Sequence, residues 1–196
     1  AEGALLPGTY RFEKGQSTAD MIAEMQEAMI KALDQAWAKR SQDLPFTTRE
    51  EALVLASVIE KETAKPEERT RIAGVFTNRL RESMPLQTDP TVIYAITKGR
   101  EKNEGMGPLG RRLLLKDLKI DSPYNTYLYA GLPPGPICNP GLASIEAALH
   151  PEENEYLFFV ADGTGGHVFS KTLKEHEANR ANWRKIRREQ STAPKE

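Results

Sequence analysis

The sequence predicts an α+β fold that is mainly helical. Several stretches place apolar side chains three and four residues apart, the period of an amphipathic helix. In contrast, two short apolar runs, 156–160 and 167–170, flank a glycine-rich segment that is typical of a β-hairpin turn. No internal repeat is present, and 196 residues suit one globular domain. We therefore predict a single domain over residues 1–190, followed by a disordered tail over 191–196.

Composition excludes several kinds of partner and site. The 27 basic and 28 acidic side chains nearly cancel, so the whole molecule offers no electrostatic reason to bind nucleic acid or an anionic membrane. The single cysteine, Cys138, excludes an internal disulfide and a cysteine-rich zinc site. The three histidines have no short metal-ligand spacing, so we predict no metal site. No apolar run reaches the roughly 18 residues of a membrane span. Because the chain starts at Ala1, we expect it to be a piece of a longer protein whose membrane anchor was left out.

Two long helices are predicted in the first third of the chain. Ser17 and Asp20 form a capping pattern before the first helix. One face of that helix carries the regularly spaced Met21, Ile22, Met25, Met29, Leu33 and Trp37, and is expected to be buried. After a break at Leu44, Pro45 and Phe46, either Thr47 or Thr48 can cap a second helix that should end near Ala64.

Two shorter helices should follow. Pro66 is at a position tolerated in the first turn of a helix. The apolar face of this helix is formed by Ile72, Val75, Phe76 and Leu80. The polar Asn78, Arg79 and Arg81 are expected to be solvated, with no catalytic role. Asp89 and Pro90 are a good start for the next helix, over 91–97.

The second half of the chain should be less regular. Residues 98–112 contain four glycines and several charges, which predicts an exposed loop. An extended stretch is predicted over 122–129, whose three tyrosines, amide and hydroxyl groups suit carbohydrate as well as an ordinary interior. Proline and glycine should make 131–141 a stiff, irregular wall. A basic helix is predicted over 173–190.

Two glutamates end the apolar run of the second predicted helix. Glu62 shares a stripe with Leu55, Val58 and Ile59, so it should face inward, whereas Glu60 follows smaller and more polar neighbours. Desolvation can keep a carboxyl group protonated near neutral pH, and a neutral carboxylic acid is a proton donor. Cleavage of a glycosidic bond needs such a donor beside the scissile oxygen. The alternative is that both glutamates are solvated charges in the last turn of a helix.

Five motifs, in order along the chain, are similar to those of a known family. They are Ala-Ser-Val-Ile-Glu-Lys-Glu-Thr at 56–63, Leu-Gln-Thr-Asp-Pro-Thr-Val-Ile-Tyr at 86–94, Tyr-Asn-Thr-Tyr at 124–127, Gly-Leu-Pro-Pro-Gly-Pro-Ile at 131–137 and Phe-Val-Ala-Asp-Gly-Thr-Gly-Gly-His at 159–167. Their joint occurrence is far more specific than any one motif. The chain resembles the YceG-like endolytic murein transglycosylases, also called MltG.

This resemblance implies a lysozyme-like catalytic core and a role for particular residues. The catalytic glutamate of the family is the second of its Glu-Lys-Glu motif, which falls on Glu62. Motif membership also makes Gln87, Asp89, Tyr124, Asn125 and Thr126 candidates for contacts with sugar, although each can instead be a structural cap or turn. The resemblance further implies a native anchor in the bacterial inner membrane, a LysM-like region largely missing here, and a catalytic domain that faces the periplasm.

The activity implied is non-hydrolytic cleavage within peptidoglycan glycan strands. Glu62 would protonate the oxygen between N-acetylmuramic acid and N-acetylglucosamine and then take the proton from the muramoyl 6-hydroxyl, giving a 1,6-anhydro end and terminating elongation of nascent strands. One glutamate serves both steps, so no cofactor or metal is expected. Penicillin-binding synthases are the expected protein partners. The alternatives are a hydrolase with Asp89 or Glu60 as second carboxylate, and a binding scaffold in which Glu62 is inert.

Overall fold

The computed structural model describes residues 1–100 and 108–192, with side chains described through residue 189. Residues 101–107, which belong to the predicted loop 98–112, lie outside the described residues. The same holds for residues 193–196 of the predicted tail, whereas residues 191 and 192 continue the last helix.

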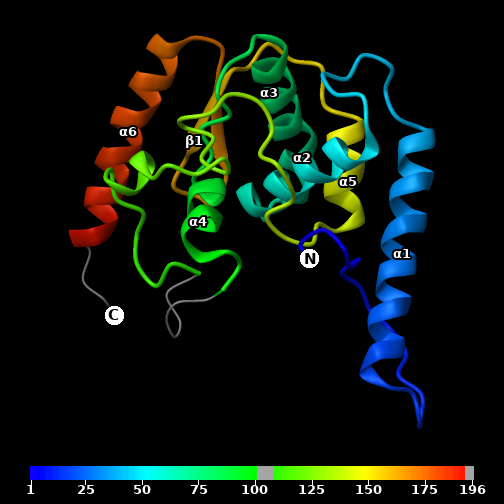
Figure 1. The fold of residues 1–196 in the computed structure, drawn as a ribbon. Coiled ribbons are helices and arrows are strands. Elements are labelled where there is room, and N and C mark those ends of the chain that lie inside the picture. The colour runs from blue at the N-terminus through cyan, green and yellow to red at the C-terminus, as the bar shows by residue number, and fades with distance from the viewer. Residues whose placement is uncertain (101–107, 193–196) are drawn as a thin grey trace.

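The described elements confirm the α+β class, with helices predominating (Figure 1). In chain order they are α1 (Thr18–Ala38), α2 (Arg49–Glu62), the 3-10 helix η1 (Pro66–Glu68), α3 (Arg69–Arg81), α4 (Asp89–Thr97), the 3-10 helix η2 (Asp117–Lys119), α5 (Leu142–Leu149), β1 (Phe158–Ala161), β2 (His167–Ser170) and α6 (Leu173–Thr192). No described helix combines the length and the apolar character needed to cross a membrane.

Helix α2 runs through the centre of the molecule (Figure 1). Thr48 caps it in a reciprocal capping box with Glu51, one of the two predicted caps. Its buried side chains point in every direction, as expected for a helix enclosed by others. Helix α5 packs against α1, α2 and α3 and closes this core. The sequence interpretation missed α5, because a helix of 8 residues after a proline-rich segment has too few turns to show a period.

Helix α1 has the predicted cap, and its predicted apolar face is buried only in part. Ser17 and Asp20 form a capping box. Only Met29, Leu33 and Ala36 are buried, and they belong to the C-terminal half of the helix. The N-terminal half extends beyond the other helices in Figure 1, and Ile22 is 42% exposed. The first turns are covered only in part, by the segment before α1, whose Leu6 N–H donates to the Met25 carbonyl at 3.1 Å, and Met21 and Met25 are partly buried.

The hairpin is confirmed, and α6 covers it. Strands β1 and β2 are antiparallel, with Phe159 opposite Phe169, and α6 packs against both strands.

The prediction of an extended stretch over 122–129 was wrong. This segment folds into turns in which the Asn125 carbonyl accepts hydrogen bonds from the backbone N–H groups of Leu128 and Tyr129. The three tyrosines of the segment have different partners: the Tyr124 ring packs against Tyr94, and the hydroxyls of Tyr127 and Tyr129 donate to Asp89 and Asp121.

Candidate active site

A cavity of about 450 Å³ lies where α2 ends, α4 begins and the hairpin meets α6. Its lining includes Glu62, Gln87 and Asp89 from the predicted site. The further lining residues are Arg79, Leu86, Leu118, Tyr127, Phe158, Phe159, Val160, Ala161, His167, Leu173, His176 and Arg180. The tertiary structure thus brings three of the six predicted site residues to one cavity with aromatic and cationic walls.

Glu62 is the last residue of α2 and lines this cavity. It is half-buried at the end of a helix whose preceding apolar residues are fully buried. Burial raises the pKa of Glu62 to about 7, and the nearby Asp89 carboxylate acts in the same direction. The side chain is therefore substantially protonated near neutral pH, as the stripe argument predicted.

Thr88 lies beside Glu62 with an unused hydroxyl. Its Oγ1 is buried and has no hydrogen-bond partner of good geometry among the described residues. It is close enough to Glu62 to oppose the rise in pKa. A buried polar atom without a hydrogen-bond partner lowers the stability of the fold. A hydroxyl of this kind beside a carboxyl group can donate a hydrogen bond to that group when it is charged.

Asp89 is held by a tyrosine that the sequence interpretation did not select. The Tyr127 hydroxyl donates to Asp89 Oδ1 at 2.6 Å. Burial and the Asp89 carboxylate raise the pKa of Tyr127 well above its usual range, so this hydroxyl stays a donor. Tyr127 ends the Tyr-Asn-Thr-Tyr motif, and its place in that motif was the signal that could have identified it.

Gln87 has a left-handed backbone with φ of 52°, which is uncommon for a residue other than glycine. The conformation is fixed by Thr126, whose carbonyl accepts from the Gln87 N–H at 3.0 Å and whose Oγ1 accepts from the Thr88 N–H at 3.1 Å. Strained backbone of this kind persists where the surroundings determine it, and it is common at functional sites. The Gln87 side chain contacts Arg79 through its Oε1 at 3.4 Å.

The other three candidates for sugar contact, Tyr124, Asn125 and Thr126, are not among the residues that line this cavity. Asn125 is fully buried, and its Nδ2 donates to the carbonyls of Leu118 and Ile120. Thr126 is 1% exposed and bonds the segment that carries Gln87. The Tyr124 ring packs against Tyr94 with a centroid distance of 4.8 Å. In this structure, all three side chains contact protein groups that support the site.

Arg79 is buried, so the expectation that it is solvated was wrong. Its exposed fraction is 6%, and its Nε donates to the Leu157 carbonyl at 2.6 Å. Its Nη1 donates to the carbonyls of Pro85 and Leu86 at 2.9 and 3.2 Å. These bonds connect α3 to the strand and to the segment before Gln87. A helical period assigns a residue to a face, but it cannot show that another segment covers that face.

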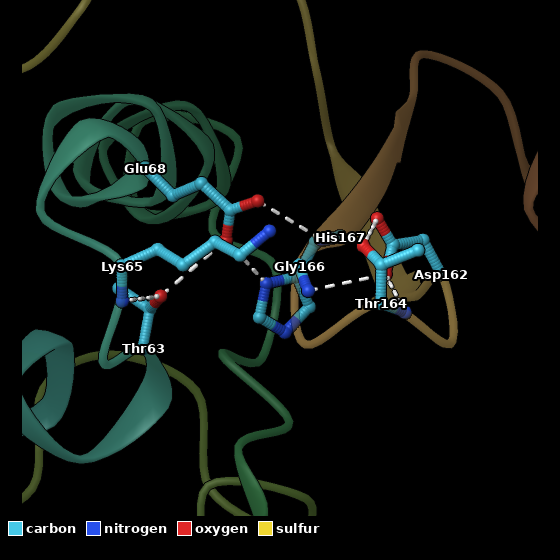
Figure 2. Close-up of polar contacts among 7 residues, drawn as sticks. All are labelled: Thr63, Lys65, Glu68, Asp162, Thr164, Gly166 and His167. Atoms are coloured by element: carbon cyan, nitrogen blue, oxygen red, sulfur yellow. Dashed lines mark hydrogen bonds and ion pairs between the residues drawn. The ribbon is translucent and has the colours of Figure 1, made fainter.

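The hairpin is anchored beside the end of α2 by Glu68 (Figure 2). Glu68 Oε1 accepts from the His167 backbone N–H at 3.0 Å, and Oε2 lies 2.7 Å from His167 Nδ1. The Thr63 hydroxyl, directly after Glu62, donates to the same carboxylate at 3.3 Å. Burial alone would raise the pKa of Glu68, but the hydrogen bonds from His167 outweigh it and lower the pKa.

The turn of the hairpin is shaped for this close approach. Asp162 Oδ1 accepts from the N–H groups of Thr164 and Gly166 at 2.7 and 3.1 Å (Figure 2). A Cβ atom at Gly166 would lie 2.7 Å from Glu68 Oε1 and 2.6 Å from Lys65 Nζ. A side chain at Gly166 would therefore displace the ends of Lys65 and Glu68, so glycine favours the close contact between the turn and Glu68.

Glu60 lies away from the cavity and contacts the start of α5. Its Oε2 accepts from the Ser144 hydroxyl at 2.6 Å and from the Gly141 N–H at 3.2 Å, at the start of α5. Asp89 is thus the carboxylate that shares the cavity with Glu62. In the described part of the chain, no group of three or more His, Cys, Asp or Glu side chains has an arrangement that could hold a metal ion.

Comparison with known proteins gives one consistent result. The profile of the YceG-like family matches residues 1–182. An endolytic murein transglycosylase of Bacillus subtilis is 45% identical over 177 residues, which are 89% of this chain and 46% of that protein. The protein of that name from Streptococcus pneumoniae serotype 2 is 39% identical over 91% of this chain and 31% of its own length. The chain therefore spans less than half the length of these curated relatives. A crystal structure of a putative yceG-like protein from Listeria monocytogenes has 43% sequence identity and a TM-score of 0.73, over 90% of this chain and 54% of that chain.

Proposed function

Because the chain belongs to the YceG-like family, we propose that it is the catalytic part of an endolytic murein transglycosylase. The observation that carries this proposal is the position of Glu62, whose pKa is raised to about 7 in a cavity that also holds Asp89. The curated relatives from Bacillus and Streptococcus carry that name. The substrate would be a peptidoglycan glycan strand.

In the first step, neutral Glu62 protonates the glycosidic oxygen between N-acetylmuramic acid and N-acetylglucosamine. The C1–O bond breaks, and positive charge develops at the anomeric carbon. Asp89, oriented by its 2.6 Å bond from Tyr127, supplies negative charge in the same cavity, near Glu62. The Thr88 hydroxyl can donate to Glu62 once that side chain is charged, which stabilises the intermediate protonation state.

In the second step, the Glu62 carboxylate takes the proton of the muramoyl 6-hydroxyl as that oxygen bonds to C1. The product is a 1,6-anhydro end, and Glu62 is again protonated. A lysozyme-like hydrolase, with water in place of the 6-hydroxyl, is the second candidate because Asp89 shares the cavity with Glu62. On our proposal the enzyme acts on the cell wall outside the inner membrane, where an anchor would hold it near penicillin-binding synthases.

The test is cleavage of purified, un-crosslinked glycan strands by the parent chain and by Glu62→Gln, with the products read by mass spectrometry. We expect anhydro-muramoyl ends from the parent only, with a rate loss in the variant of about 10²–10⁴, the usual contribution of a general acid. Glu60→Gln is the matched control, because Glu60 contacts the start of α5 and not the cavity. Reducing ends would favour hydrolysis, and equal activity in parent and Glu62→Gln would refute the assignment.

A further inference from the structure

Two arginines and a histidine meet at the end of the cavity under α6, and the arginines lack acidic partners. Arg79, His176 and Arg180 all line the cavity. Within residues 1–100 and 108–189, no carboxylate oxygen lies within 4.0 Å of the guanidinium group of Arg79 or of Arg180. The carboxylates Glu62 and Asp89 line the same cavity, but neither is paired with these arginines. The lining is therefore of mixed charge, and neither of its two arginines has a carboxylate partner among these residues.

Phe158 packs against two of these residues, and burial and the neighbouring arginines lower the pKa of His176, which favours its neutral form. The His176 ring stacks on it with a centroid distance of 5.1 Å and an interplanar angle of 22°. The Arg79 Cζ lies 5.0 Å from the centroid of the same ring. Backbone carbonyls occupy the Arg79 Nε and Nη1 groups, so this arginine supplies a fixed positive field. By contrast, His176 Nδ1 is buried without a hydrogen-bond partner among the described residues.

Arg180 is the member that can reach a ligand directly. It follows His176 by one helical turn, so the two side chains share the face of α6 that meets the cavity. The side chain is exposed, and no described group accepts a hydrogen bond from its guanidinium group. A guanidinium group in this setting is suited to bidentate binding of a planar anion such as a carboxylate.

We propose that Arg180, with His176 beside it and the Arg79 charge behind it, forms a subsite for a carboxylate carried by the glycan strand. This inference rests on the proposed function, which makes peptidoglycan the substrate. A muramoyl residue can present a carboxylate in two ways. When the peptide is absent, the lactyl group ends in one, and when the peptide is attached, its amino acids carry others. Either would orient the strand with its charged substituent towards α6 and its scissile bond towards Glu62.

The experiment measures binding by the inactive Glu62→Gln chain, so that cleavage does not interfere. Two double variants are made from this chain. One adds Arg180→Gln, and the other adds Arg184→Gln as the matched control. Arg184 is one turn further along α6, is exposed and does not line the cavity. Three ligands are compared: strands with peptides, strands freed of peptides, and peptide-free strands whose lactyl carboxylates have been converted to neutral amides. We expect Arg180→Gln to weaken binding of a carboxylate-bearing strand about tenfold, and Arg184→Gln to leave it unchanged.

The outcomes separate the two sources of the carboxylate. A loss on the peptide-free strand alone assigns the lactyl group, and a loss on the peptide-bearing strand alone assigns the peptide. A loss on both, absent on the amidated strand, shows that the subsite accepts a carboxylate from either source. An equal loss on the amidated strand would show that Arg180 contributes contact area instead of charge, and no difference between Arg180→Gln and Arg184→Gln would show that it contributes nothing. Either result overturns the subsite. Cleavage by the parent is scored separately, so failure of the transglycosylase proposal and failure of the subsite are distinguishable.

Discussion

At the residue scale, the environment that suits Glu62 to proton transfer also costs stability. An unfolded glutamate has a pKa near 4.5, whereas burial and the nearby Asp89 raise the pKa of Glu62 in the folded chain to about 7. Between these values the folded chain binds more protons than the unfolded chain, so stability falls as the pH rises through this range. Above pH 7 the folded state must hold a poorly solvated carboxylate. The acid of the proposed site is thus a destabilising group at alkaline pH.

We predict that Glu62→Gln is more stable than the parent at pH 8, by up to about 3 kcal/mol, because a shift of one pKa unit corresponds to about 1.4 kcal/mol. The difference should vanish near pH 4, where Glu62 is neutral in both folded and unfolded chains. Urea unfolding at the two pH values measures it. Glu67→Gln, at an exposed position, should show no such gain. A gain of the same size at pH 4 would indicate better packing by glutamine and not relief of a charge.

The same titration should set the alkaline limit of activity. Cleavage requires protonated Glu62, so we expect the rate to fall as the pH rises through about 7. Asp89 contributes to the raised pKa, so Asp89→Asn should move this alkaline limb to lower pH whatever it does to the maximal rate. A pH profile of strand cleavage for parent and variant checks this. An unmoved limb in Asp89→Asn would mean that the charges of Asp89 and Glu62 are not coupled.

At the scale of elements, the position of the hairpin depends on a contact distant in sequence. Glu68 in η1 binds His167 at the start of β2, next to Thr63 and the end of α2 (Figure 2). The pKa of Glu68 is lowered, so its contribution to stability is present above the unfolded value of about 4.5 and is lost as the pH falls through the lower folded value. The cavity wall formed by β1 is held in place through this contact.

We predict that Glu68→Gln lowers the free energy of unfolding at pH 7 by about 1–3 kcal/mol, the usual cost of losing a hydrogen bond to a buried charged group. Amide hydrogen exchange should become faster in β1 and β2 and stay unchanged in α2 and α5. The neighbouring Glu67→Gln is the control, because Glu67 is exposed. Unaltered exchange in the hairpin would show that α6 alone holds it in place.

At the scale of the whole molecule, one hydrophobic core connects the elements. It includes residues from α1, α2, α3 and α5, and Phe159 and Phe169 of the hairpin pack against it. The first turns of α1 extend beyond this core (Figure 1). Apolar residues of similar size therefore differ greatly in their contribution. Ile59, in α2, is fully buried, whereas Ile30, in α1, is 58% exposed.

We predict that Ile59→Ala lowers the free energy of unfolding by about 2–5 kcal/mol, since it leaves a cavity in the core. Ile30→Ala should change it by less than about 0.5 kcal/mol, as is usual for surface substitutions. Denaturant unfolding followed by both circular dichroism and tryptophan fluorescence measures the two values. Similar losses in the two variants would mean that the exposed side of α1 is covered in solution.

The sequence by itself determined the features that depend on neighbours along the chain. The cap at Ser17, a cap at Thr47 or Thr48, the apolar period of α2 and the glycine-rich turn of the hairpin were all readable, because each needs only a few consecutive residues. The structure selected Thr48. The inward position of Glu62 followed from the same period. The motifs placed Gln87 and Asp89 at a site without showing its shape.

Only the tertiary structure decided what surrounds Glu62. Tyr127 joins Asp89 because turns over 122–129 bring it there, and Arg79 is buried because the segments of Leu86 and Leu157 cover it. His176 and Arg180 reach the cavity because α6 packs on the hairpin. These contacts join positions far apart in the sequence. The physical reason is that periodicity gives the face on which a side chain lies, whereas its charge environment depends on which distant segment packs against that face.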